Sequence, residues 1–392
     1  MQKKTFGVLL TEYMYRIGMS ESFLGNKIGV SSETVRKWKL EYTKPRKTNR
    51  DKVVAAAKLM RLKEEETNDL LEAVPFPKEF PVIEDLAEAI FINFIPSLFN
   101  RLDRLAYPIM LLLTQATWGE PPFRKALLVH AKNRYSPENV LHIQPPYNLD
   151  MDTYFADLGE QCGFDNVNSG NSLKKTFDKR IKNNRLFLLI SRFENSEPSL
   201  REELAKMIRA LSDVHTNRLH VMFCGGAGLS ELKFKNCAMS LLNLAEVEHW
   251  PELGYLEVKA LAKYRFQKLQ LSDDLANELL YISGGHPQLL NECLKIRQAF
   301  PRFALDKYPE LLSQRDYIWQ LFTPFMQNIV EKKQIGEWLQ QEHLGKMQPY
   351  ILNDLIRQLY WKNLLVGKEM DGEKYLFWRC KAIKMAGLEI LI

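Results

Sequence analysis

Polar and basic side chains gather in a short stretch near the beginning of the chain, and their types suit contact with nucleic acid. Lysine and arginine neutralise phosphates, whereas hydroxyl and carboxylate side chains can hydrogen-bond to the edges of bases. The side chains in question are Ser31, Ser32, Glu33, Thr34, Arg36, Lys37, Lys39, Lys44 and Arg46. Their density predicts a DNA-contacting surface in which the basic residues bind phosphates.

Two short helices would have to position these side chains. Apolar residues that can lie between the helices recur at Phe23, Leu24, Ile28, Val30, Val35 and Trp38. Gly29 stands where the first helix must end, and Ser31 or Ser32 can cap the second. The spacing therefore predicts a helix-turn-helix over residues 20–39, whose second helix presents its polar face to the major groove.

This pattern resembles the Cro and repressor-type helix-turn-helix family, also called the XRE family, over roughly residues 5–74. The resemblance implies a five-helix bundle that binds double-stranded DNA. The family's aromatic residue and closing proline correspond to Trp38 and Pro45, whereas Lys39 replaces the acidic residue usual at the end of the recognition helix. Because some members of the family no longer bind DNA, a protein-binding module is the alternative.

Length and charge place this module beside a larger body. A chain of 392 residues is too long for one hydrophobic core, and a net charge of +6 fits one basic module joined to a near-neutral body. We expect a DNA-binding domain at 1–74, a proline-rich linker at 75–82, a P-loop-like α/β domain at 83–255, a helical lid at 256–305 and a winged-helix domain at 306–392.

The cysteines and histidines do not indicate a metal site. The five cysteines form no C-x-x-C pair, and the seven histidines share no ligand spacing. Scattered cysteines are typical of reduced cytosolic thiols. No apolar run approaches the ~20 residues of a membrane span, and no signal peptide opens the chain. We therefore expect a cytoplasmic protein with no metal and no membrane partner.

Short apolar runs alternate with helical patterns in the middle of the chain. The runs cover residues 109–113, 140–143, 186–190 and 219–223. This alternation predicts a parallel sheet with helices on both faces. Later residues are mainly helical and end in a hairpin of residues 363–367 and 374–378, which predicts a winged helix. The expected fold class is therefore multidomain, α and α/β.

The order of these elements resembles the STAND branch of the P-loop ATPases, an AAA-like group, over roughly residues 83–392. Residues 186–195, 219–229 and 284–290 carry the resemblance, and the last of these is similar to the family's lid motif. The resemblance implies a phosphate loop, an acidic strand that binds Mg²⁺, and a lid proline near the base of the nucleotide. An unrelated α/β fold is the alternative.

The phosphate loop itself is degenerate. Its pattern, G-x-x-x-x-G-K-[ST], supplies backbone N–H groups, a lysine for the phosphates and a hydroxyl for Mg²⁺. After the run 109–113, Gly119 comes one residue early, and Glu120, Pro121 and Pro122 replace Gly-Lys-Ser/Thr. A glutamate repels phosphate, and proline has no N–H to donate.

The acidic strand is degenerate as well, because Ser191 and Arg192 replace the acids that would hold the metal and position water. The remaining, vestigial nucleotide site consists of Gln115, Gly119, Arg124, Lys125, Ser191, Arg192, His286 and Pro287. We expect a pseudo-ATPase with no catalytic residue and no cofactor.

Each of two basic segments in the larger body has two possible roles. The stretch 174–182 is a solvated helix face or a second contact with the DNA backbone, and the aromatic and basic stretch 375–384 either touches DNA or packs on the α/β domain. The function we expect is a DNA-binding transcription regulator or adaptor. Its partners would be double-stranded DNA and either another protein or a second copy.

Two alternatives remain. One is a nucleotide-binding ATPase switch that uses unusual contacts. The other is a scaffold subunit of a prokaryotic defence or transposition complex.

Overall fold

The computed structural model describes residues 4–62, 64–76, 90–116, 121–147, 150–236, 239–266, 269–348 and 351–392. The chain divides into two compact units, Met1–Leu86 and Ala87–Ile392, and each is described here by itself. Of the linker expected at 75–82, only residues 75 and 76 lie within the described ranges.

The N-terminal unit is built from helices. They are α1 (Phe6–Arg16), α2 (Glu21–Ile28), α3 (Ser32–Lys39), the 3-10 helix η1 (Lys47–Asn49), α4 (Arg50–Leu59) and α5 (Glu64–Glu72). The Ser20 and Ser31 hydroxyls cap α2 and α3 by accepting backbone N–H groups. Gly29 ends α2 at φ +68°, a left-handed conformation that turns the chain toward α3.

One apolar core holds these helices together. Trp38 of α3 is only 3% exposed and meets the ring of Phe6 on α1 edge-on, with the ring centroids 6.3 Å apart. The carboxylate of Glu41 accepts the backbone N–H of Gly7 at 3.2 Å and so caps the beginning of α1. The buried side of α3 is therefore apolar, and α3 and the residue Glu41 that follows it both contact α1.

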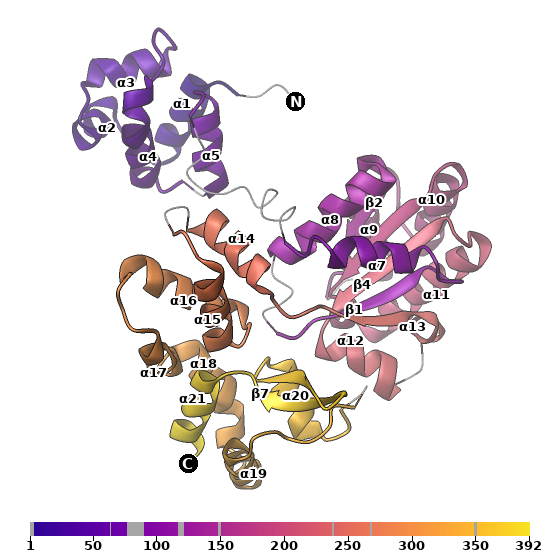
Figure 1. Cartoon of the computed structure of the whole chain (residues 1–392). Coiled ribbons are helices and arrows are strands. Elements are labelled where there is room, and N and C mark those ends of the chain that lie inside the picture. Colours follow the sequence, from indigo (N-terminus) through magenta and orange to yellow (C-terminus); the bar gives the residue numbers. More distant parts are fainter. Residues whose placement is uncertain are drawn as a thin grey trace. The chain divides into compact units, whose positions relative to one another are not determined.

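The second unit contains a five-stranded parallel sheet, which confirms the predicted α/β fold (Figure 1). Its strands are β1 (Ile109–Leu113), β2 (Val140–Ile143), β3 (Leu186–Ser191), β4 (Leu219–Gly225) and β5 (Glu246–His249). They lie side by side in the order β2-β3-β4-β1-β5. The first four strands match the predicted apolar runs, whereas the polar edge strand β5 was not predicted.

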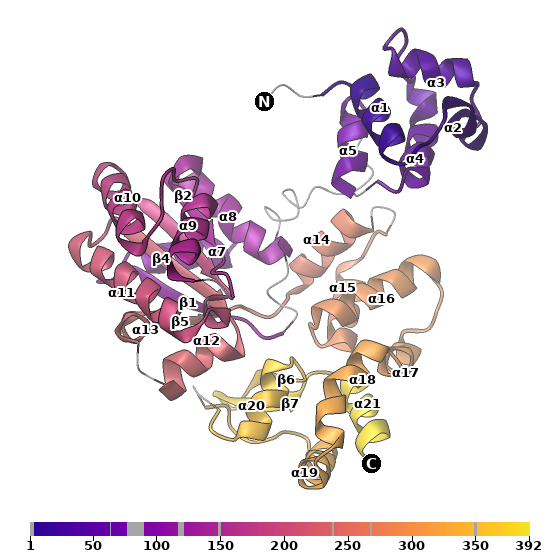
Figure 2. The same cartoon turned by 180° about the vertical axis from the view of Figure 1, so that it is seen from behind.

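Helices cover both faces of the sheet (Figures 1 and 2). On one face, Phe99 of α7 (Phe94–Leu102) and Tyr135 of α8 (Pro121–Tyr135) pack on Phe187 of β3. The other face packs against α9 (Met151–Gln161), α10 (Gly170–Asn183), α11 (Pro198–Val214) and α13 (Ser240–Leu244). The 3-10 helices η2 (Pro137–Asn139) and η3 (Phe193–Asn195), the helix α12 (Ala227–Glu231) and the π-helix η4 (Leu232–Asn236) complete this part.

Helices follow the sheet in the same unit. They are α14 (Tyr255–Arg265), α15 (Asp273–Ser283), α16 (Pro287–Ala299), η5 (Leu305–Lys307), α17 (Tyr308–Ser313), α18 (Asp316–Phe322), η6 (Thr323–Met326), α19 (Ile329–Gln340) and α20 (Asp354–Trp361).

An antiparallel hairpin of β6 (Leu365–Met370) and β7 (Glu373–Trp378) comes next, and α21 (Lys381–Leu391) packs against α17, α18 and α19. The first hairpin strand lies later in the chain than predicted. The reason is the tight turn at Asp371 and Gly372, both at positive φ, which pairs Met370 with Glu373.

Candidate functional site

The outward face of α3 carries most of the side chains predicted to contact DNA. Ser32, Glu33, Arg36 and Lys37 are exposed, while Val35 and Trp38 face the core. Lys37 lies 3.7 Å from Glu33, a loose and exposed pair that leaves its ammonium accessible. Ser31 and Thr34 are bonded to each other at 2.8 Å at the beginning of the helix.

The remaining residues predicted to contact DNA differ in whether their charge is accessible to a phosphate. Lys39 donates to Glu21 of α2 at 2.8 Å, so its charge joins two helices of the unit. Lys44 and Arg46 are exposed in the segment after α3, on either side of the buried Pro45. The structure thus gathers Ser32, Arg36, Lys37 and this segment as accessible polar groups of the N-terminal unit.

The second candidate region is the edge where the strands of the sheet end. β1 and β4 are neighbours, but the chain leaves them toward opposite edges, β1 toward β2 and β4 toward β5. In open parallel sheets a ligand binds at such a switch point, outside the carboxyl ends of the strands. A nucleotide would therefore be expected beside the residues that follow β1.

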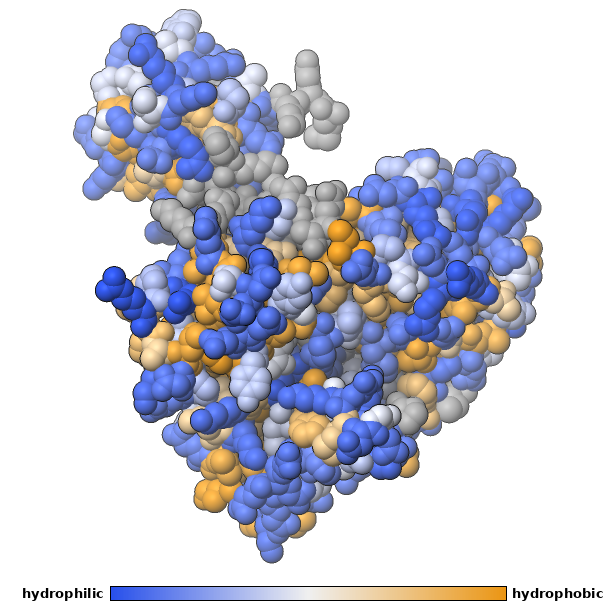
Figure 3. Space-filling model, in the orientation of Figure 1, coloured by the Kyte–Doolittle hydropathy of each residue, from blue (hydrophilic) through white to orange (hydrophobic). Residues whose placement is uncertain are grey.

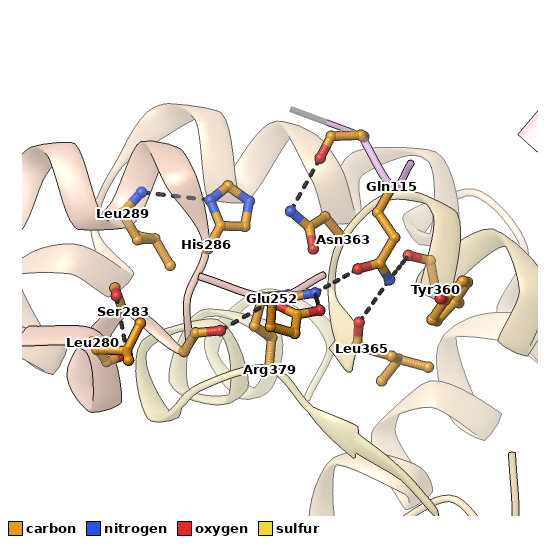
Figure 4. Close-up of polar contacts among 12 residues, drawn as sticks. Gln115, Glu252, Leu280, Ser283, His286, Leu289, Tyr360, Asn363, Leu365 and Arg379 are labelled. Carbon is orange, nitrogen blue, oxygen red and sulfur yellow. Dashed lines mark hydrogen bonds and ion pairs between the residues drawn. The ribbon is translucent and has the colours of Figure 1, made fainter. Parts of the chain in front are cut away.

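The C-terminal segment occupies the immediate exit of β1 (Figure 4). Gln115 is buried, and its amide donates to the carbonyl oxygens of Tyr360 at 2.7 Å and Leu365 at 2.9 Å. The Ala116 N–H donates to Trp361 O at 2.9 Å, and the Asn363 amide donates to Ala116 O at 3.0 Å. The backbone of Ala116 is therefore bonded to α20 and to Asn363, and the side chain of Gln115 is bonded to α20 and β6.

A buried arginine completes this arrangement (Figure 4). The Arg379 guanidinium donates to both carboxylate oxygens of Glu252, at 2.6 and 3.1 Å, and to Gly284 O at 3.0 Å. It also donates to the side-chain oxygen of Gln115. The side chain of Arg379 has no exposed surface. Of the two interpretations of the stretch 375–384, Arg379 therefore fits packing inside the protein and not contact with DNA. We call Gln115, Glu252, Gly284 and Arg379 the arginine node.

The segment expected to be a lid motif, which begins at Gly284, packs on the same node. Gly284 lies at φ +59°, and a Cβ there would stand 2.2 Å from the carbonyl oxygen of Arg379. His286 is buried, and its Nδ1 accepts the N–H of Leu289, while Pro287 is the first residue of α16. Burial, and then the charge of Arg379, lower the pKa of His286 to about 3, so the ring is neutral at pH 7. This segment therefore has a structural role: it begins α16, and the carbonyl oxygen of Gly284 accepts a hydrogen bond from Arg379.

The end of β3 offers no metal ligand set. Ser191 is buried and shares a hydrogen bond of 2.9 Å with His142 Nε2, and burial lowers the pKa of that histidine to about 4. Arg192 is exposed at φ +60°. Glu194 accepts the Gly226 N–H at 3.4 Å, and burial raises its pKa. Among the described residues, no cluster of His, Cys, Asp and Glu could hold a metal ion.

The beginning of α8 is also poor in donors. Pro121 and Pro122 occupy its first two positions and have no N–H to offer a phosphate. Arg124 and Lys125, the fourth and fifth residues of α8, are partly exposed, whereas Gly119 lies outside the described residues. Within the described residues, then, the ends of β1 and β3 show no Walker-type set of phosphate and Mg²⁺ ligands: a serine, Ser191, ends β3, and Ala116 after β1 is bonded to the protein's own chain.

No helix within the described ranges has the length and apolarity of a membrane span.

Glu252 was missed from sequence, and Arg379 was noted only as part of a basic segment. The Arg379–Gln115 contact joins residues 264 positions apart, and no short motif contains both. The single available signal was Arg379 itself, an arginine between Trp378 and Cys380 at the end of an apolar strand.

No protein-family model matches the sequence, and no curated protein matches it either. Among solved structures, the Walker-type ATPase of Pyrococcus abyssi is 11% identical with a TM-score of 0.44, covering 75% of this chain and 94% of that chain. The ORC2 protein of Aeropyrum pernix is 12% identical with a TM-score of 0.38, covering 79% and 92%. Cdc6p of Pyrobaculum aerophilum is 14% identical with a TM-score of 0.37, covering 81% and 96%. These values are too low to carry a conclusion about function.

Proposed function

We propose that this chain is a DNA-binding regulator or adaptor whose ATPase-like body no longer handles nucleotide. In this proposal the N-terminal unit is an XRE-type helix-turn-helix with α3 as its recognition helix. The body is a degenerate STAND-like domain that ends in a winged helix of α19, α20, β6, β7 and α21. The body recruits a protein partner or senses a signal.

The observation that carries the proposal is the division of α3 into two faces. Val35 and Trp38 anchor the helix in the core, and Arg36 and Lys37 project from the opposite face as exposed cations. A recognition helix needs this arrangement because its apolar side must fix the register while its polar side reaches phosphates and base edges. The exposed Lys44 and Arg46 extend the positive surface beyond the helix.

The arginine node supports the second half of the proposal. A nucleotide at the switch point would need the backbone after β1 for its phosphates, but Gln115 and Ala116 are engaged by α20 and β6. In this proposal Ser191 stands in place of the metal acid, and the described residues after β1 supply no anion cradle. The body then serves as a rigid platform, with its C-terminal segment fixed against the sheet.

The experiment is a binding titration of the full chain with duplex DNA at several salt concentrations. Arg36→Ala and Lys37→Ala should each weaken binding, and each lost phosphate contact should lower the slope of log K against log salt by ~0.9. Lys58→Ala is the matched control, because Lys58 is an exposed lysine of α4 in the same unit. If Lys58→Ala weakens binding as much as Arg36→Ala, α3 is not the DNA-contacting helix.

A further inference from the structure

Basic side chains gather at the edge of the sheet opposite the arginine node. The strands are parallel, so the segments that lead into β2, β3 and β4 all meet at their amino edge. Arg134 stands near the end of α8, Arg185 directly precedes β3, and Arg218 directly precedes β4. The helix α10 reaches the same edge at its C-terminal end, because Asn183 is followed by β3 at Leu186.

The helix α10 adds a row of lysines to this edge. Its buried residues Leu173, Phe177 and Ile181 face the core. On the other side Lys175, Lys179 and Lys182 follow one another at the spacing of one helix face. We define the amino-edge surface as Arg134, Lys175, Lys179, Lys182, Arg185 and Arg218.

Hydrogen bonds to backbone carbonyl oxygens fix the end of α10 beside neighbouring segments. Arg218 donates from its guanidinium to Lys182 O at 2.5 Å, and Leu186 donates its N–H to Arg218 O at 2.8 Å. Arg180 also donates to the carbonyl oxygen of Glu138, before β2. These bonds fix the end of α10 beside the segments that precede β2 and β4, so the cations belong to one continuous surface.

Acidic side chains neutralise this surface only in part. Asp103 is shared by Arg134 and Arg185, and Asp178 is shared by Lys182 and the buried His215. Lys175 and Lys179 have no ion-pair partner within the described part of the chain. Residues 170–185 contain six basic residues and one acidic residue. The excess positive charge is exposed, since Lys175 and Lys179 are exposed and even the paired side chains of Lys182 and Arg185 are 63% and 51% accessible.

The chemistry of the surface fits a polyanion better than a protein. Protein interfaces bury an apolar core, often with aromatic residues. Among the exposed large apolar residues of the described chain, Val214 and Leu244 lie at the amino edge of the sheet, and neither is aromatic. Figure 3 shows a hydrophilic surface over α10, in the orientation of Figure 1. From Lys175 to Lys182 the helix rises about 10 Å, enough to face about three successive phosphates of one DNA strand.

We propose that the amino-edge surface binds the phosphate backbone of duplex DNA without reading its sequence. This deepens the proposed function, on which it rests for the identity of the nucleic acid, by adding a contact on the second unit to the one made through α3. Of the two interpretations of the basic stretch 174–182, the structure assigns the DNA contact, because cations from three other segments complete it.

The test uses the full chain and a labelled duplex of arbitrary sequence, titrated across a salt series. The variant is Lys175→Gln, Lys179→Gln and Lys182→Gln, which removes three charges without placing acids at the end of a helix. The control is Arg302→Gln, Lys307→Gln and Lys333→Gln, which removes three exposed charges from elsewhere in the same unit. The slope of log K against log salt should fall by ~0.9 per lost contact, or up to ~2.7 in the variant, and stay unchanged in the control.

The single variant Lys179→Gln guards against misfolding of the triple variant and should lower the slope by about one contact, ~0.9. An unchanged slope in both amino-edge variants overturns this inference, and so does an equal loss in the control.

The variant Arg36→Ala with Lys37→Ala separates this inference from the proposed function. If it alone weakens binding, the proposed function stands and the amino-edge contact is overturned. If only the amino-edge variants weaken binding, the amino-edge contact stands and binding through α3 is overturned. Absence of DNA binding by the unmodified chain at low salt overturns both.

Discussion

Replacing Arg379 by Met should destabilise the second unit by about 2–6 kcal/mol, because two acceptors at the arginine node lose their donor. The change leaves two acceptors without their donor, the side-chain oxygen of Gln115 and the carbonyl oxygen of Gly284. Each such unsatisfied group costs about 1–3 kcal/mol. The side chain of Glu252 is 44% exposed, so its carboxylate regains water and adds little to the cost.

The assay is urea unfolding of the full chain, followed by circular dichroism and tryptophan fluorescence. Lys346→Met is the matched control, since it removes an exposed pair with Glu373 in the same C-terminal segment and should cost about 1 kcal/mol or less. A double-mutant cycle of Arg379→Met with Glu252→Gln should give a coupling of about 1–3 kcal/mol. If Arg379→Met costs no more than the control, the arginine node does not hold the C-terminal segment on the sheet.

Three further predictions follow from buried groups. Trp38→Ala should cost about 3–5 kcal/mol and unfold the N-terminal unit, so a stable variant that only loses DNA binding would instead assign Trp38 to the DNA surface. Gly284→Ala should destabilise the second unit by more than the ~1 kcal/mol of positive φ alone, because its Cβ would meet Arg379 O; an unchanged melting temperature would contradict that contact. Acid should destabilise the second unit, because burial lowers the pKa of His220 to about 4 and that of His286 to about 3, while their pKa values in the unfolded chain stay near 6.5. The unfolded chain then binds more protons, so stability should fall by up to ~1.4 kcal/mol per pH unit for each histidine below pH ~6.5. Urea unfolding at several pH values measures this slope, which His286→Asn should reduce; a stability that stays flat from pH 6.5 to 5 would refute it.

Local patterns were enough to predict most of the sheet. The strands β1, β3 and β4 are short apolar runs, because both faces of a central parallel strand are buried, and the edge strand β2 is apolar at three of its four positions. β5 escaped notice because its Glu246 and Glu248 are polar. In the structure these carboxylates form ion pairs with Arg101 of α7, a partner that only the folded chain brings near.

The candidate sites also differ in how far local sequence patterns can predict them. The residues proposed to contact DNA lie within sixteen consecutive positions, 31 to 46, and the helix periodicity of this stretch separates exposed from buried side chains. The proposed loss of nucleotide chemistry also rests on the sequence, since it is inferred from the absence of Walker-type residues in the segments after residues 113 and 190. The arginine node could not be predicted from sequence. Its residues Gln115, Glu252 and Arg379 come from three distant segments and meet only through the packing of the C-terminal segment on β1.

The most direct test of the account is a calorimetric titration of the full chain with Mg²⁺ and ATP, paired with a measurement of phosphate release. The account predicts no saturable heat up to millimolar nucleotide and phosphate release equal to the buffer background, with or without DNA. Stoichiometric binding of ATP, or turnover that disappears on Arg124→Ala or Glu194→Gln, would show that the end of β1 admits a nucleotide despite the bonds of Gln115 and Ala116 to the C-terminal segment.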